Sequence, residues 1–189
     1  MTSKPLSGMK IGILVASGFE ELHVTGAQRA LMEAGATVCM IGLDQGLVNG
    51  WIGKSWGHYF AIDAKIGETL ATDYNALIVP GGDRAVTKLL SNKHVARVIT
   101  TAIDAGFPLA VLGAGVEIID FAGRAKGRKL TGAQNSATRM TEAGADWAGD
   151  DLIIQDEHIL SARDDSNVDS FVEKMIALFV DKCEFRQAA

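Results

Sequence analysis

The sequence has few of the residues that mark several common classes of protein. Its 189 residues include only two cysteines, Cys39 and Cys183, too few and too far apart for a disulfide framework or a zinc site. No apolar run approaches the roughly 18 residues that a membrane-spanning helix needs, and residues 1–8 lack the apolar core of a signal peptide. The net charge is −5 and no run is rich in Lys or Arg, which argues against a nucleic-acid surface. We therefore expect a cytoplasmic protein with neither a membrane nor a nucleic-acid partner.

A hydrophobic content of 48% in a chain of this length suits one compact domain with a full core. No internal repeat, linker or low-complexity stretch divides the chain. We expect a flexible N-terminal arm at residues 1–8, a single domain at residues 9–183 and a C-terminal tail at residues 184–189.

Strand and helix patterns alternate along the chain. Short apolar runs with almost no polar alternation predict buried parallel strands at residues 10–16, 37–42, 76–79 and 109–112. Helical spacing predicts helices at residues 20–34, 83–90, 92–105, 136–143 and 168–182, and a late strand pair is expected at residues 152–154 and 158–162. Asn92 is the expected cap of the third of these helices, and Asp165, Ser166 or Asn167 of the last. This order predicts a doubly wound, mostly parallel α/β sheet with helices on both faces.

Residues 46–62 interrupt the alternation. Their glycines are interleaved with Trp51, Trp56, Tyr59 and Phe60, which predicts a small β-hairpin. An aromatic group of this kind either packs over the sheet edge or forms a surface for a partner.

The segment at residues 107–120 is the most informative part of the chain. It has the pattern of a buried strand, a tight turn at residues 113–115 and an apolar helix start, the geometry in which α/β enzymes mount a nucleophile. The apex residue is Gly113, which has no side chain, and glycine adopts a strained apex conformation without a Cβ penalty. The pattern predicts the architecture of an active site without its nucleophile.

Several motifs occur in an order that resembles the DJ-1/PfpI superfamily, most closely its bacterial PfpI-like branch. They are Phe19-Glu20-Glu21, the hairpin from Gly50 to Gly57, the segment at residues 73–82 and the segment at residues 127–131. The resemblance covers residues 9–182 and implies a flavodoxin-like fold of the class I glutamine-amidotransferase type. It also implies a homodimer or a higher oligomer.

The resemblance also implies that the family's cysteine chemistry is lost. The family's elbow reads Ala-Ile-Cys-His-Gly-Pro, and the matching stretch here is Val111-Leu-Gly-Ala-Gly-Val116. Gly113 takes the place of the nucleophilic cysteine and Ala114 that of its histidine, so these two residues form a vestigial elbow. A family glutamate that hydrogen-bonds the cysteine is replaced by His23.

Other residues near the expected elbow could still act. His23, beside Glu20, could serve as a general base, or it could be a neutral histidine that fills the space left by the cysteine. A metal site is not expected, because no second histidine follows at ligand spacing. The resemblance implies that the backbone N–H groups of Gly82 and Ala114 form an oxyanion-type site, while the two glycines after the strand could equally serve only a tight turn.

Three residues have simpler expected roles. Glu20 and Glu21 stand at the start of a helix, where the helix dipole favours carboxylates without any function. Their charges also argue against a nucleotide phosphate at this turn. Cys39 lies among apolar residues and is expected to be an inert core thiol.

Two hypotheses of function follow, with a third beside them. In the first, the protein has lost cysteine-dependent catalysis and persists without a cofactor as a small-molecule-binding or structural, oligomeric protein, its ligand a small carbonyl or carboxylate compound. In the second, it is a cysteine-independent hydrolase or lyase, such as a hydratase, that uses His23 or Glu20 with a backbone oxyanion hole. In the third, it is a purely oligomeric scaffold with a collapsed pocket.

Overall fold

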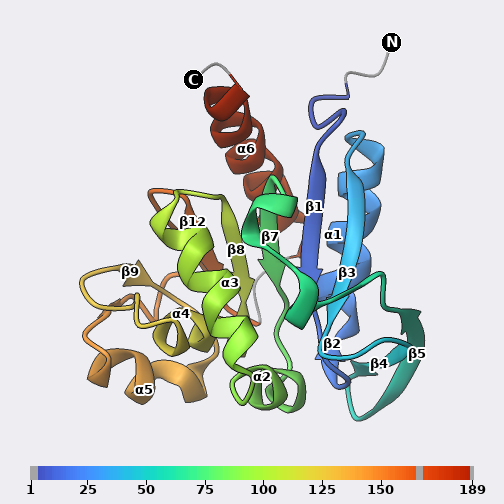
Figure 1. Ribbon diagram of the computed structural model, residues 1–189. Coiled ribbons are helices and arrows are strands. Elements are labelled where there is room, and N and C mark those ends of the chain that lie inside the picture. Colours follow the sequence, from blue (N-terminus) through green and yellow to red (C-terminus); the bar gives the residue numbers. More distant parts are fainter. Residues whose placement is uncertain (1–3, 165–167, 188–189) are drawn as a thin grey trace.

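The computed structural model describes residues 4–164 and 168–187, and it has the expected α/β architecture (Figure 1). Seven strands form the central sheet in the order β11-β12-β8-β7-β1-β3-β6. β11 pairs antiparallel with β12, and the other pairs are parallel. The strands are β1 (Lys10–Leu14), β3 (Thr37–Gly42), β6 (Ala64–Lys65), β7 (Ala76–Val79), β8 (Leu109–Leu112), β11 (Ile153–Asp156) and β12 (Ile159–Ala162). The order β3-β1-β7-β8-β12 is the flavodoxin-like order, in which β3, the second strand of this sheet along the chain, lies outside β1, the first.

Helices cover both faces of this sheet. In Figure 1, α1 (Glu21–Glu33) and α6 (Val168–Gln187) lie behind the sheet and α3 (Lys93–Asp104) lies in front of it. The remaining helices, α2 (Asp83–Leu89), α4 (Glu117–Phe121) and α5 (Ala137–Glu142), lie towards the end of the molecule opposite the two termini. Among the described residues, no helix is long and apolar enough to cross a membrane.

The apolar pattern of the sequence accounts for these elements. All four residues of β7 and all four of β8 are buried, as expected for central strands covered on both faces. The buried residues of α3 recur at helical spacing: Val95, Val98, Ile99, Ala102 and Ile103. The predicted cap of α3 is confirmed, because the Asn92 side chain accepts a hydrogen bond of 2.9 Å from the N–H of His94.

Two expectations about the chain ends need correction. Leu6 is fully buried and its N–H donates to the carbonyl of Ala34 at 2.9 Å, so the described part of the N-terminal arm packs against the domain. The free energy gained by burying this apolar side chain beside the end of α1 outweighs the conformational entropy that a flexible arm would retain. The last helix continues to Gln187 and takes up most of the expected C-terminal tail. The cap expected at residues 165–167 lies outside the described residues.

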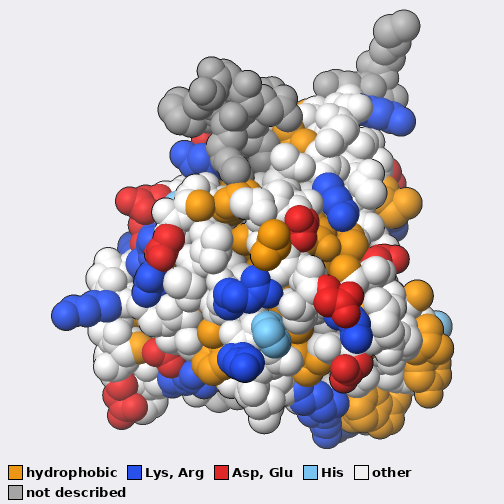
Figure 2. Space-filling model, in the orientation of Figure 1, with side chains coloured by type: hydrophobic (Ala, Val, Ile, Leu, Met, Phe, Trp, Pro, Cys, Tyr) orange, Lys and Arg blue, Asp and Glu red, His pale blue; other side chains and the backbone are white. Residues whose placement is uncertain are grey.

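The predicted hairpin is confirmed as β4 (Leu47–Ile52) and β5 (Ser55–Ala61), which pair antiparallel. A strand that we did not expect, β2 (Phe19–Glu20), joins them in a small second sheet, and β9 (Lys129–Leu130) pairs with β10 (Asp146–Trp147) in another. The Phe60 ring packs edge-on against Phe19, with centroids 5.2 Å apart. Trp56 and Tyr59 stay exposed, and Figure 2 shows hydrophobic side chains gathered over this hairpin.

Candidate functional site

A cavity of about 220 Å³ lies where the chain leaves the carboxyl ends of β1, β7 and β8. Its wall includes Gly18 and Glu20 after β1, Gly82 after β7, and Ala114 after β8. In open α/β sheets, ligands bind outside the carboxyl ends of the strands, at the point where the strand order reverses. This sheet reverses between β1 and β7, so the cavity lies at the position that the fold offers to a ligand.

The expected elbow is present beside this cavity. β8 runs into a 3₁₀ turn, η3 (Gly113–Val116), which continues into α4. Gly113 has a φ of +52°, in the left-handed region that disfavours residues with a Cβ. A Cβ at this position would lie 3.1 Å from the Cβ of Asp164, a closer contact than real Cβ atoms usually make. The apex is thus shaped for a glycine both by its backbone and by its neighbour.

His23 reaches the cavity from α1, as expected, but it is tightly held there. Its residue is only 4% exposed, and its Nδ1 accepts a hydrogen bond of 3.1 Å from the N–H of Gly81. Burial lowers the pKa of His23 from 6.5 to about 4, against the opposing effects of the Asp164 charge and a hydrogen bond to the Asp164 backbone. The imidazole is therefore neutral at pH 7, with Nδ1 unprotonated.

Three carboxylates line the cavity: Glu20, Asp83 and Asp164. Burial raises the pKa of Glu20, and the negative charges of Glu21 and Asp164 raise it further. The same three carboxylates also line a more open adjoining depression of about 620 Å³, together with Gln134, Asn135 and Arg163. The two hollows therefore form one acidic cleft.

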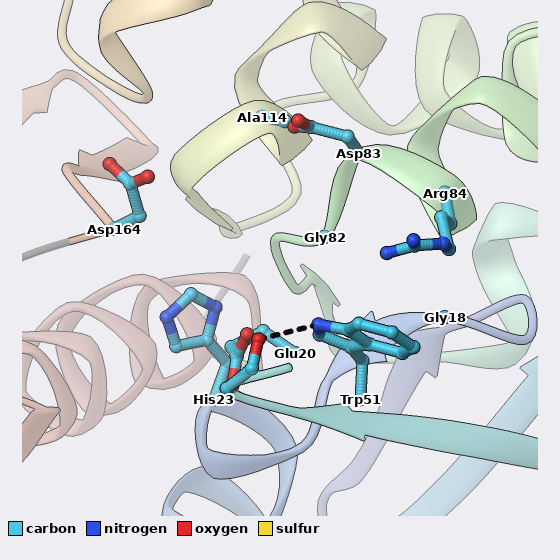
Figure 3. Close-up of a pocket in the computed structure, with 10 residues that line it drawn as sticks. Gly18, Glu20, His23, Trp51, Gly82, Asp83, Arg84, Ala114 and Asp164 are labelled. Carbon is cyan, nitrogen blue, oxygen red and sulfur yellow. Dashed lines mark hydrogen bonds between the residues drawn. The ribbon is translucent and has the colours of Figure 1, made fainter. Parts of the chain in front are cut away.

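The opposite wall comes from the hairpin and the start of α2. Trp51 lines the cavity, and its indole Nε1–H donates to the carbonyl of Gly53 at 2.8 Å (Figure 3). The Arg84 guanidinium lies 3.9 Å from the centre of the Trp51 ring, in a cation–π arrangement. The Trp56 ring packs edge-on against Trp51 at 5.3 Å. Trp51 is thereby fixed from two sides.

Glu21 does more than the helix-start role that we expected. It is 5% exposed, and its carboxylate accepts the His58 N–H at 2.8 Å and lies 2.6 Å from the His58 Nδ1. A Cβ at Gly50 or at Gly57 would collide with this carboxylate, so the two glycines make room for it inside the hairpin. The glycine spacing and His58 were visible in the sequence, but nothing in the sequence linked them to Glu21, so this buried carboxylate could not be predicted.

Cys39 lies on β3, outside the residues that line the cavity. It is 7% exposed, and its sulfur lies 3.3 Å from the hydroxyl oxygen of Tyr74. Within the described part of the chain, no three His, Cys, Asp or Glu side chains are grouped so that they could hold a metal ion.

Of the site residues expected from the sequence, the structure places four in the cavity wall: His23, Glu20, Gly82 and Ala114. The apex Gly113 lies beside the cavity, next to Asp164 and Gly81. Sequence reasoning missed the contributions of Asp83, Arg84, Trp51 and Asp164 to the same cavity. Asp83 and Arg84 directly follow the Pro-Gly-Gly turn, which was the one available hint for them. Asp164 comes from a segment far along the chain and carried no signal beyond its charge.

Comparison with known proteins agrees with the family resemblance found in the sequence. The sequence model of the DJ-1/PfpI family matches residues 9–178. Deglycase PfpI of Pyrococcus furiosus is 26% identical over 170 residues, which span 90% of this chain and 99% of that protein. General stress protein 18 of Bacillus subtilis is 24% identical over 171 residues, which span 90% of this chain and 98% of that protein.

Solved structures share the fold. A ThiJ/PfpI domain protein from Brachyspira murdochii superposes with a TM-score of 0.83 at 15% identity, over 93% of this chain and 98% of that one. DJ-1beta of Drosophila melanogaster superposes with a TM-score of 0.78 at 18% identity, over 93% of this chain and 90% of that one.

Proposed function

The chain belongs to the DJ-1/PfpI family, and within that family we propose that it is a small-molecule-binding protein without cysteine-dependent catalysis. Its ligand site is the cavity beside the Gly113 elbow. The observation that carries this proposal is the glycine at the apex, with its φ of +52°. Among the described residues, no Cys, Ser, Thr or Lys side chain lines the cavity to take the place of the missing nucleophile.

The state of His23 supports a binding role over a base-catalysed reaction. A general base works best with a pKa near the operating pH, and the pKa of His23 is about 4. Its Nδ1 is engaged by Gly81, and the Asp164 backbone forms a further hydrogen bond with the ring. His23 joins α1 to the turn after β7 and fills the space beside the elbow.

The backbone around the cavity supports binding of a carbonyl group. The N–H groups of the first turn of a helix have no partner within that helix. Gly82 caps α2, Ala114 lies in η3, and both residues line the cavity. We propose that their N–H groups donate to a ligand oxygen.

A cysteine-independent hydrolase or lyase is the second candidate, and the observation that favours it is Glu20. This carboxyl group lines the cavity and its pKa is raised, chiefly by burial, as in many carboxyl groups that exchange protons with a substrate. In this version Glu20 moves the proton and the N–H groups of Gly82 and Ala114 hold the carbonyl oxygen.

Turnover assays with methylglyoxal, a glycated amino acid and a peptide substrate separate the two candidates. We expect no turnover above a heat-inactivated control, together with thermal stabilisation by at least one member of a metabolite set, because a ligand that binds the folded state raises the unfolding temperature. Turnover that Glu20→Gln abolishes and the matched change Glu33→Gln leaves intact would establish the second candidate. Glu33 is exposed at the far end of α1, the helix that Glu20 caps.

We further propose that the protein forms homo-oligomers through the hairpin. Leu47, Trp56 and Tyr59 are more than half exposed there, and exposed aromatic side chains are typical of protein interfaces. Light scattering after size exclusion should give a multiple of the chain mass, and Trp56→Glu with Tyr59→Glu should reduce it. A monomeric wild-type protein at all concentrations tested would refute this assembly.

A further inference from the structure

We infer that the outer face of the hairpin receives a second copy of this protein, with the Tyr59 side chain of each copy seated in a hollow on the other. The hollow has a volume of about 320 Å³ and is lined by Ser17, Asn49, Trp56 and Tyr59. This inference rests on the homo-oligomer proposed above and deepens it, because it names the contact through which two hairpins meet.

The register of the hairpin places its exposed apolar side chains on one face. Residues directly opposite each other in an antiparallel pair have their side chains on the same face of the sheet. The register shifts between Asn49 and Trp51, and this irregularity turns Trp56 and Tyr59, three residues apart, to the same side. Three pairs thus share the outer face, because they involve alternate residues of β4: Leu47 with Ala61, Asn49 with Tyr59, and Trp51 with Trp56.

This outer face is apolar although it is open to solvent. A hairpin with one solvated face usually alternates apolar residues inside with polar residues outside. Here the other face is already packed, since Phe60 contacts Phe19. On the outer face, Leu47, Trp56 and Tyr59 are nevertheless 65%, 53% and 71% exposed. Large exposed apolar side chains gathered on one face mark a surface for a protein partner.

The absence of charge on this face favours a second copy as that partner. None of the residues in the three pairs is Asp, Glu, Lys or Arg. The whole chain carries a net charge of −5, so two copies repel each other wherever their carboxylates meet. An uncharged face lets two copies meet without this repulsion, whereas a basic partner gains no attraction there.

The hollow beside Tyr59 gives the contact a specific shape. Ser17 Oγ accepts the N–H of Asn49 at 3.2 Å, and the side-chain Oδ1 of Asn49 is buried without a donor among the described residues. A buried acceptor of this kind needs a donor from water or from a partner. The volume of about 320 Å³ lies at the lower end of the roughly 300–1,000 Å³ range of small-molecule pockets, enough for one aromatic side chain.

The Tyr59 side chain of a second copy fits this hollow. Its ring is apolar and exposed, and its hydroxyl supplies the O–H donor that Asn49 lacks. A two-fold axis repeats the insertion in both directions, as an isologous interface requires. One contact therefore covers both exposed Tyr59 rings and pairs both Asn49 acceptors.

A double-mutant cycle on the dimer tests the inference. Sedimentation equilibrium gives a dissociation constant for the wild type, Tyr59→Ala, Tyr59→Phe, Asn49→Ala and the double variant Tyr59→Phe with Asn49→Ala. We expect Tyr59→Ala to weaken the dimer at least tenfold, because it removes the ring and the hydroxyl together. Tyr59→Phe should weaken it several-fold alone and much less beside Asn49→Ala, because the hydroxyl then has no acceptor to lose. The control Leu152→Ala, at an exposed apolar residue next to β11, should have no effect.

The outcomes separate this inference from the homo-oligomer itself. A dimer that Tyr59→Ala weakens by less than twofold would overturn the inference and leave a homo-oligomer standing. Equal losses from Tyr59→Phe with and without Asn49→Ala would overturn the pairing of the hydroxyl with Asn49. A wild-type protein that stays monomeric at every concentration would refute the homo-oligomer and this inference together.

Discussion

Replacement of Gly113 by alanine tests the shape of the apex directly. The φ of +52° places an L-residue in the left-handed region, at a cost of roughly 1–2 kcal/mol. The loss of unfolded-state freedom on replacing glycine offsets about 0.4–1 kcal/mol of this. The new Cβ would lie 3.1 Å from the Asp164 Cβ, and Asp164 is exposed and can yield, so this contact should add only a little. We expect Gly113→Ala to destabilise the protein by about 1 kcal/mol, which lowers the melting temperature by about 2–4 °C for a chain of this size.

Urea unfolding monitored by circular dichroism measures this change, and Gly123→Ala is the matched control. Gly123 has a φ of +67° and no heavy atom within 4 Å of its would-be Cβ, so it reports the backbone cost without a contact. Gly113→Ala should be destabilised at least as much as this control. If Gly113→Ala left the free energy of unfolding unchanged or raised it, while Gly123→Ala lowered it, the left-handed conformation of Gly113 would be refuted. A cysteine placed at position 113 would carry the same loss of stability, because it too has a Cβ.

Three other predictions follow from buried groups. The pKa of His23 is about 4 in the folded protein and 6.5 unfolded, so protons bind the unfolded chain first and stability should fall between pH 6.5 and 4 by up to roughly 3 kcal/mol. Urea titrations should show that His23→Gln flattens this acid dependence, and an unchanged slope would count against the buried neutral imidazole. Gly57→Ala should cost about 1–3 kcal/mol, because its Cβ meets a buried carboxylate, while the Cβ of the control Gly67→Ala comes no closer than 3.8 Å to its nearest neighbour; equal effects in thermal melts would contradict this steric reasoning. With Cys183→Ser, the remaining thiol of Cys39 should resist iodoacetamide in the native protein and react once after unfolding, as mass spectrometry would show; rapid native labelling would be evidence against its burial.

Local patterns predicted the fold well where burial decides the structure. The runs at residues 37–42, 76–79 and 109–112 are apolar without alternation, and the strands have these same bounds. The short strands β2 and β6 were missed, because a pair of residues carries no periodicity. The packing of Leu6 was missed for a similar reason: a single apolar residue in a polar segment gains its burial from distant parts of the chain.

The candidate site was predictable only in part. The apex at Gly113 and the approach of His23 followed from motifs that lie close to strand ends. The role of Asp164 was not readable, since it reaches the cavity through tertiary packing rather than local sequence. The low pKa of His23 likewise comes from burial, which depends on the finished fold.

The Glu21 carboxylate inside the hairpin couples two parts of the protein that look separate in the sequence. Gly50, Gly57 and His58 surround this carboxylate. A hairpin taken from another protein would therefore have to supply both glycines to fit against Glu21. A transplanted hairpin that lacks either glycine would be pushed away from α1 and would take Trp51 out of the cavity wall with it. Glu21 therefore helps to fix the position of one cavity wall, although Glu21 itself is not among the residues that line the cavity.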